Sequence, residues 1–218
     1  MFVGHYAPAL AVAATGRPSP RLGTLFVAAQ FVDLAFFGLM LAGVEHLRIV
    51  PGITAMNPMD LYDMPWTHSL AGTCGWAVLF AATLWLAVRN WRMAAIGALV
   101  VVSHWPLDLL VHRPDLTLAG SPPAWGLGLW DHPAIEMPLE TLLVAGALLF
   151  YAGRTRPRRH GRLSLAILTL AMVVVQAVNW FGPPPEAATP AIPLSALLAY
   201  GLLATLAWWT GRTREAKA

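Results

Sequence analysis

The chain has 218 residues with a formal net charge of +3, and 57% of them are hydrophobic while only 11% are charged. Because soluble domains carry about 25% charged residues, this composition excludes an ordinary soluble domain. It predicts an all-α, membrane-embedded helical bundle that forms one domain over residues 1–218. Cys74 is the only cysteine, which excludes a disulfide framework and a zinc site built from cysteines.

Apolar segments of spanning length recur along the chain, and each can cross about 30 Å of hydrocarbon. A shorter apolar segment at 3–15 has no Lys or Arg before it, so we expect a retained short helix rather than a secretory signal. Pro106 and Pro138 fall inside two long segments, where a kink would turn backbone carbonyls toward a cavity. We therefore predict six to seven transmembrane helices, the long ones over 22–44, 67–88, 93–112, 134–153, 163–181 and 192–210.

Basic residues occupy alternate connections between these segments. All but two of the 14 lie on one side, and the exceptions are Arg48 and Arg113. Since cytoplasmic loops are enriched in Lys and Arg, we predict a cytoplasmic C-terminus and outward loops at 45–66, 113–133 and 182–191. This topology accounts for the positive charge, so no nucleic-acid partner is expected. The basic side holds Arg17, Arg21, Arg89, Arg92, Arg154, Arg156, Arg158, Arg159, Arg162, Arg212, Arg214 and Lys217.

Six of the seven histidines lie on the side that basic residues avoid. In VVSHWPLDLLVH, the residues His104, Asp108 and His112 are spaced i, i+4, i+8, which places them on one face of a helix. Ionisable groups at membrane depth are costly unless they have partners. Histidine and carboxylate are favoured ligands of zinc-like ions, so we predict a metal site. Hydrogen bonds to other helices are the alternative for these side chains.

Further candidate ligands lie near the same membrane face. His132 and Glu136 repeat the i, i+4 spacing, although acidic residues there also suit a helix N-terminus. His68 begins a helix in WTHSL, and Asp33 in QFVDLAFFG has no Lys or Arg nearby. A cation is the natural partner of such a buried carboxylate. We expect Glu45, His46 and Glu140 to lie around the ligands and to hold them through hydrogen bonds.

The order of GH near the start, a lone intramembrane Asp, THSL and SHxxLD resembles a family of bacterial inner-membrane proteins classed as metal-dependent hydrolases. That family is distantly similar to the zinc-dependent phospholipase C and P1 nuclease group, an all-helical fold with a three-zinc site. The resemblance covers residues 4–140, so the site is expected there, with the C-terminal helices over 163–210 outside it. DMPWTHS lacks the HR pair that often precedes THS in the membrane family.

The resemblance implies a distribution of ligands over two or three zinc ions, with another divalent metal still open. It assigns Asp33, His68, His104 and Asp108 to a central ion. Asp108 would bridge to a second ion that is also bound by His5. The third ion would take His112, His132 and Glu136, although the interval from Asp108 to His112 is shorter than in the soluble enzymes.

These features together predict a phosphoesterase that hydrolyses a lipid or lipid-linked phosphate at the outer face of a bacterial inner membrane. The metal would activate water, and Asp33 would orient or deprotonate that water or bind the ion directly. With a rise of about 1.5 Å per residue, Asp33 lies about 16 Å below Val44, in the outer leaflet. Alternatives are an ion-coupled transporter, a haem-binding electron carrier, or a membrane protein that binds metal or a partner without catalysis. The oligomeric state is not indicated.

Overall fold

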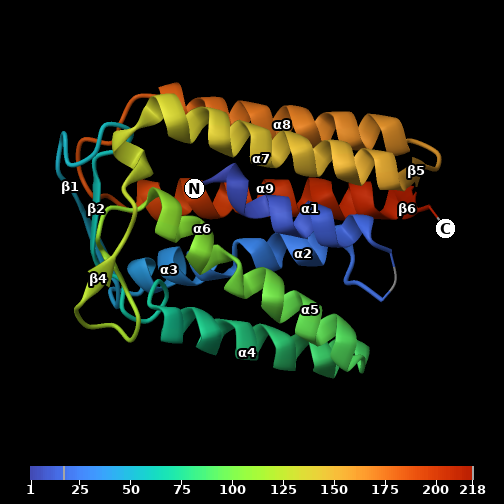
Figure 1. The fold of residues 1–218 in the computed structure, drawn as a ribbon, viewed down its shortest axis with the longest axis horizontal. Coiled ribbons are helices and arrows are strands. Elements are labelled where there is room, and N and C mark those ends of the chain that lie inside the picture. Colours follow the sequence, from blue (N-terminus) through green and yellow to red (C-terminus); the bar gives the residue numbers. More distant parts are fainter. Residues whose placement is uncertain (17, 218) are drawn as a thin grey trace.

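Long apolar helices run side by side along one axis of the molecule in the computed structural model (Figure 1). The structure describes residues 1–16 and 18–217, so Arg17 of the predicted basic side lies outside the described residues. Within them, five helices are long and apolar enough to cross a membrane, and a bent helix pair supplies a sixth span. The predicted all-α bundle is therefore confirmed, with five candidate membrane spans, or six if the bent pair counts as one, against the predicted six to seven.

The helices are connected by short strands that pair two by two, always antiparallel. The strands are β1 (His46–Ile49), β2 (Met59–Asp63), β3 (Leu116–Thr117), β4 (Ala124–Trp125), β5 (Thr155–Pro157) and β6 (Arg214–Ala216). The helices are η1 (Val3–His5), α1 (Tyr6–Ala14), α2 (Leu22–Ala29), α3 (Phe31–Leu41), α4 (Leu70–Val88), α5 (Trp91–Val102), α6 (His104–Val111), η2 (Leu129–Asp131), α7 (Pro133–Arg154), α8 (Gly161–Phe181) and α9 (Ala191–Thr213).

Two of the spans are interrupted within the membrane. The pair α2 and α3 bends by 55° at Gln30, which places Asp33 in the first turn of α3. The span Trp91–Val111 is interrupted at Ser103, between α5 and α6. Pro106 lacks the N–H that would bind the carbonyl of Val102, the last residue of α5, so the helix cannot run through unchanged. By contrast, α7 continues through Pro138.

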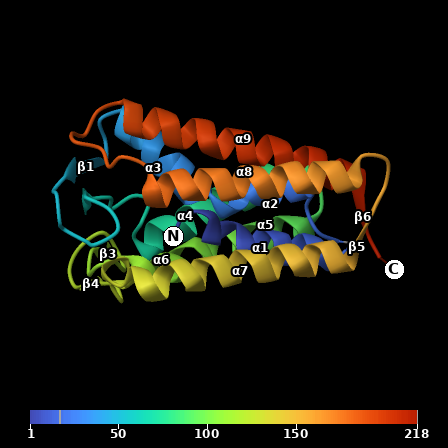
Figure 2. The same cartoon turned by 90° about the horizontal axis from the view of Figure 1, so that it is seen from above.

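The first short helix lies inside the bundle rather than across it. With nine residues, α1 is about 14 Å long at about 1.5 Å per residue, which is too short to span. It packs against α7 and α2, and Figure 2 shows it in the interior, close to α7. Its buried side chains include Tyr6, Ala9 and Leu10. The expected short helix at 3–15 is thus present, and its position brings η1 and His5 into the interior.

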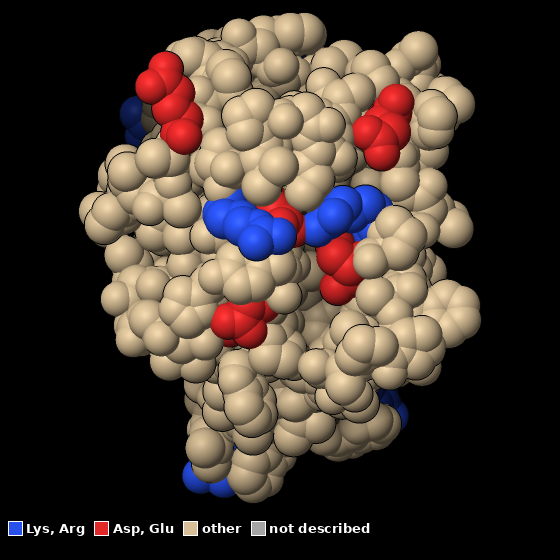
Figure 3. Space-filling model, turned by 90° about the vertical axis from the view of Figure 1, so that its left-hand side faces the viewer, with Lys and Arg blue, Asp and Glu red and all other residues tan. Residues whose placement is uncertain are grey.

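The two ends of the bundle differ in character. The hairpins that contain β1, β2 and β4 cover one end, whereas β5 and β6 lie at the other with the C-terminal segment (Figure 1). Viewed end-on, the face with β1 and β2 is mostly uncharged, and basic and acidic atoms meet near its centre (Figure 3). Helix α6, which bears the central predicted ligands, lies toward this end (Figure 1).

Candidate metal centre

Six of the predicted ligands come together in the interior of the bundle. They form two overlapping groups, His5–His104–Asp108 and Asp33–His68–His104, whose candidate donor atoms lie within 4.8 Å of one another in each group. The imidazole of His112 joins them through Nε2, which lies 3.7 Å from Asp108 Oδ1. These side chains come from η1, α3, the turn before α4, and α6 with its C-cap.

His104 points its Nε2 at two carboxylates. Its Nδ1 lies 3.0 Å from the carbonyl oxygen of Ala29, and a carbonyl only accepts, so Nδ1 carries the proton in the neutral ring. Nε2 then presents a lone pair 2.9 Å from Asp108 Oδ2 and 3.5 Å from Asp33 Oδ1. This buried Nε2 has no hydrogen-bond partner. In the neutral ring, Nε2 and the carboxylate oxygens are all acceptors, and a cation between them would stabilise this arrangement.

His68 is oriented in the same way by a two-residue relay. The hydroxyl of Thr67 donates to Glu45 Oε2 at 2.7 Å, which uses its only proton. Its oxygen must therefore accept from His68 Nδ1, 2.9 Å away. His68 Nε2 is left as an acceptor that lies 3.3 Å from Asp33 Oδ1 and 3.7 Å from Asp108 Oδ2. Outer hydrogen bonds of this kind fix the tautomer and direction of metal-binding histidines.

His112 repeats the pattern at the end of α6. Its Nδ1 donates to Asp115 Oδ1 at 2.8 Å, and its Nε2 faces Asp108 Oδ1. Three histidines thus hold their Nδ1 protons outward and direct Nε2 at the same carboxylates. Their side chains are 1–5% exposed, so water does not screen the lone pairs.

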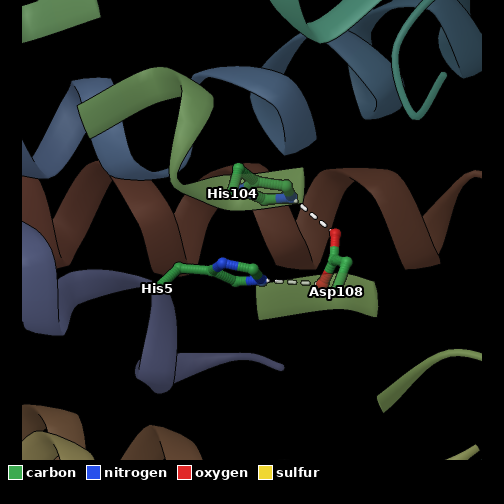
Figure 4. A group of neighbouring side chains, drawn as sticks. All are labelled: His5, His104 and Asp108. Carbon is green, nitrogen blue, oxygen red and sulfur yellow. Dashed lines mark hydrogen bonds and ion pairs between the residues drawn. The ribbon is translucent and has the colours of Figure 1, made fainter. Parts of the chain in front are cut away.

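Asp108 lies between two sets of ring nitrogens. Its Oδ2 faces His104 and His68, whereas its Oδ1 faces His112 and lies 2.9 Å from His5 Nε2 and 3.1 Å from the amino group of Met1. The rings of His5 and His104 stack with centroids 3.8 Å apart, so that both reach Asp108 from the same side (Figure 4). The two oxygens of this carboxylate therefore face two different sets of nitrogens, and the bridging role that the resemblance implies stays a prediction.

Asp33 is held from the C-terminal helix. Its Oδ1 faces His68 and His104, and its Oδ2 accepts a hydrogen bond of 2.9 Å from the hydroxyl of Tyr200 in α9. Tyr200 was not among the predicted residues, and the predicted limit of the site at residue 140 was too narrow. The available signal was a tyrosine in an otherwise apolar span, since a buried hydroxyl requires a partner.

The predicted third ligand set does not assemble. Within the described residues, His112, His132 and Glu136 form no common group of donor atoms. His132 is the N-cap of α7 with φ −127° and ψ 66°, and its side chain is exposed. Glu136 is buried with Oε2 unpartnered. His112 instead joins His5 around Asp108 Oδ1.

The three expected supporting residues have different roles. Glu45 is fully buried and binds the Thr67 hydroxyl that orients His68. Glu140 accepts hydrogen bonds of 2.7 Å from the amides of Phe2 and Gly4 and from Gln176, so it holds the segment that carries His5. A Cβ at residue 4 would lie 3.1 Å from Glu140 Oε1 and closer still to Met1 Sδ, which explains the glycine before His5.

His46 does not support the cluster. It is exposed and pairs with Asp63 across the β1–β2 hairpin at 2.7 Å. The cross-strand register explains the contact, because His46 and Asp63 are direct partners in the ladder. Its adjacency to Glu45 in sequence is therefore misleading, because Glu45 lies just before β1 and is buried whereas His46 is the exposed first residue of the strand.

Comparison with known proteins yields no relative: no protein-family model matches the chain, and no match is found among the curated proteins or the solved structures. The geometry alone therefore carries the functional argument. It establishes a buried His/Asp cluster that could hold metal ions in a helical bundle suited to a membrane.

Proposed function

We propose that the chain is a membrane-embedded, metal-dependent hydrolase that cleaves a phosphoester bond of a lipid or lipid-linked phosphate at the outer face of the membrane. The observation that carries the proposal is the common orientation of three histidines. Each engages Nδ1 with an outer acceptor and turns an unprotonated Nε2 toward the carboxylates of Asp33 and Asp108.

We infer positions for two divalent ions around Asp108. Asp33, His68 and His104 would hold the first, next to Asp108 Oδ2. His5 and Asp108 Oδ1 would hold the second, with His112 Nε2 3.7 Å from that oxygen. Nitrogen and carboxylate donors without cysteine favour zinc, although another divalent metal would suit them. Bound there, the ions would activate water and stabilise negative charge on phosphoryl oxygens. Asp33, fixed by Tyr200, is the residue positioned to orient that water or accept its proton.

A lipid substrate follows from the location of the cluster. It lies toward the end of the bundle whose connections contain only two basic residues, Arg48 and Arg113, and this end faces outward under the positive-inside rule. The bacterial inner membrane and a cytoplasmic C-terminus complete the proposed setting. Exposed aromatic side chains at Tyr62, Trp66 and Trp125 fit the depth of lipid headgroups, where tyrosine and tryptophan are enriched.

An ion-coupled transporter is the alternative use of buried His and Asp groups. It requires polar groups that continue toward the opposite face. The main core of the bundle is instead built of apolar side chains, including Leu10, Leu25 and Leu203. This favours a site that is reached from one face only. The remaining possibility is a protein that binds the metal without catalysis, and a turnover measurement distinguishes it from a hydrolase.

The test combines metal analysis with a turnover assay on purified protein in detergent. We expect bound zinc in the wild type, its loss in His104→Ala, and its retention in His132→Ala, a matched control because His132 is exposed outside the cluster. Release of phosphorylated headgroup from mixed micelles, followed by ³¹P NMR, should stop in His104→Ala and after chelation. Equal zinc content in wild type and His104→Ala would refute the metal site, and zinc without any release would leave only binding.

A further inference from the structure

The only two basic residues of the predicted outward connections converge on one carboxylate. Arg48 Nε donates to Asp60 Oδ2 at 2.6 Å, and Arg113 Nη2 donates to Asp60 Oδ1. The Asp60 side chain is 2% exposed, whereas that of Arg48 is 65% exposed and that of Arg113 is 33% exposed. Basic residues are selected against in outward loops, so the placement of both exceptions at one point calls for a reason.

The pair uses only part of its hydrogen-bond donors in its own contacts. Each guanidinium has five N–H donors, and Asp60 takes one from each. Asp115 accepts the Nδ1 proton of His112 with Oδ1 and places Oδ2 3.4 Å from Arg113 Nε, and this buried Nε makes no hydrogen bond within the described residues. Arg48 lies over the ring of Tyr62 at 5.1 Å, which holds its guanidinium in place. Donors of both side chains therefore remain free.

This arginine pair is connected to the candidate metal centre. Arg113 follows His112 directly, and Asp115 contacts both side chains. Arg48 and Asp60 are opposite each other in the β1–β2 hairpin, which covers the same end of the bundle (Figure 1). In the end-on view, basic and acidic atoms meet near the centre of an otherwise mostly uncharged face (Figure 3). The pair thus lies on the hairpin that covers this end of the bundle and next to the candidate ligand His112.

We propose that Arg48 and Arg113 form a binding site for the phosphate group of a lipid headgroup. Guanidinium groups suit this anion because they donate paired, charge-assisted hydrogen bonds to its oxygens. The role of this site in presenting substrate rests on the proposed function, whereas phosphate binding itself requires no metal. If the two arginines only tied the hairpin to the 112–115 segment, their replacement would leave phosphate binding unchanged.

The test measures binding of dioleoylphosphatidic acid in mixed micelles, with dioleoylglycerol, which lacks the phosphate, as the lipid control and glycerol 3-phosphate as the soluble probe. We expect Arg48→Gln to weaken phosphatidic acid binding about tenfold, and Arg48→Lys to fall between it and the wild type. Arg89→Gln is the matched control, since Arg89 also lies over an aromatic ring, 4.8 Å from that of Trp85, but at the basic end. Tighter binding of phosphatidic acid than of glycerol 3-phosphate identifies the lipid as the source of the phosphate.

Equal affinity in wild type, Arg48→Gln and Arg89→Gln would overturn the proposal, as would equal binding of dioleoylglycerol. The measurement is made on metal-loaded and on chelated protein, and zinc content is determined for each variant. Unchanged phosphate affinity with normal zinc content removes the arginine site and leaves the hydrolase proposal standing. If the wild type binds no zinc but Arg48→Gln still weakens phosphate binding, the hydrolase proposal is removed and the arginine site stands. Arg48→Lys keeps the test decisive should the glutamine variant fail to fold.

Discussion

Both ends of the bundle contain ion pairs, but only one end buries them. At the basic end, Glu215 pairs with Arg156 and Arg158, whose side chains are 66% and 65% exposed. At the other end, Asp108 is 3% exposed and faces histidines that are equally buried. Exposed pairs contribute about 0–1 kcal/mol, whereas buried charges cost stability unless they are compensated.

The pairs also differ in complementarity. Arg156 Nε and Arg158 Nε donate to Glu215 oxygens at 2.7 and 2.8 Å, so donors face an acceptor. In the cluster, the lone pairs of His68, His104 and His112 face carboxylate oxygens. The exposed pairs match donors to acceptors throughout, whereas Asp108 has the Met1 amino group and His5 at Oδ1 but the Nε2 atoms of neutral His104 and His68 at Oδ2. If the proposed metal binds, it would stabilise the second set.

The largest effect on the difference between the two ends is expected from Asp108, whose carboxylate lies between two sets of histidine rings. Asp108→Asn keeps the shape of the side chain but removes the charge that both ions would share, so we expect zinc to be lost completely. Zinc should also raise the apparent unfolding temperature of the wild type and not that of the variant, because only a bound ligand stabilises. Asp63→Asn is the control, since Asp63 pairs with the exposed His46. Full zinc content in Asp108→Asn would contradict the two-set arrangement.

A smaller effect on metal affinity is expected from Thr67, which contacts the candidate ligand His68 and not the metal site itself. Thr67→Val is nearly isosteric but cannot accept the His68 Nδ1 proton or donate to Glu45. Loss of such outer partners lowers metal affinity by about 10–100-fold, and Thr67→Ser should restore most of it. Competition with a zinc chelator measures the difference. Equal affinity in the valine and serine variants would show that the relay does not orient His68.

The sequence predicted what periodicity and length control. Spans are set by apolar length, and His104 and Asp108 share a face because α6 is helical from His104 to Val111. Asp33 was predicted because an isolated carboxylate in an apolar run is costly wherever it lies. These inferences need no knowledge of which helices are neighbours.

The failures concern contacts that local spacing does not determine. His132 is the exposed N-cap of α7, so its i, i+4 spacing to Glu136 does not bring the two side chains to one site. Tyr200 reaches Asp33 across 167 positions, and the partner of Glu45, which was correctly predicted as a supporting residue, is Thr67 beyond a turn and a hairpin. Such contacts have no period in the sequence, because they follow from how the helices pack.

The weakest effect is expected at the exposed pairs, where the sign of its pH dependence is informative. Hydrogen bonds from Arg158 and Arg156 hold the pKa of Glu215 below its usual value. The stabilisation is therefore present above the unfolded pKa of about 4.3 and is lost as pH falls through the lower pKa of the folded protein. Glu215→Gln should lower the unfolding temperature at pH 7 by at most about 2 °C, with Glu186→Gln in the α8–α9 connection as control. The difference from wild type should shrink in acid and in high salt, where screening weakens exposed pairs. A difference that grows in acid, or exceeds that of Asp108→Asn, would mean that the exposed end and not the buried cluster dominates the electrostatics of this bundle.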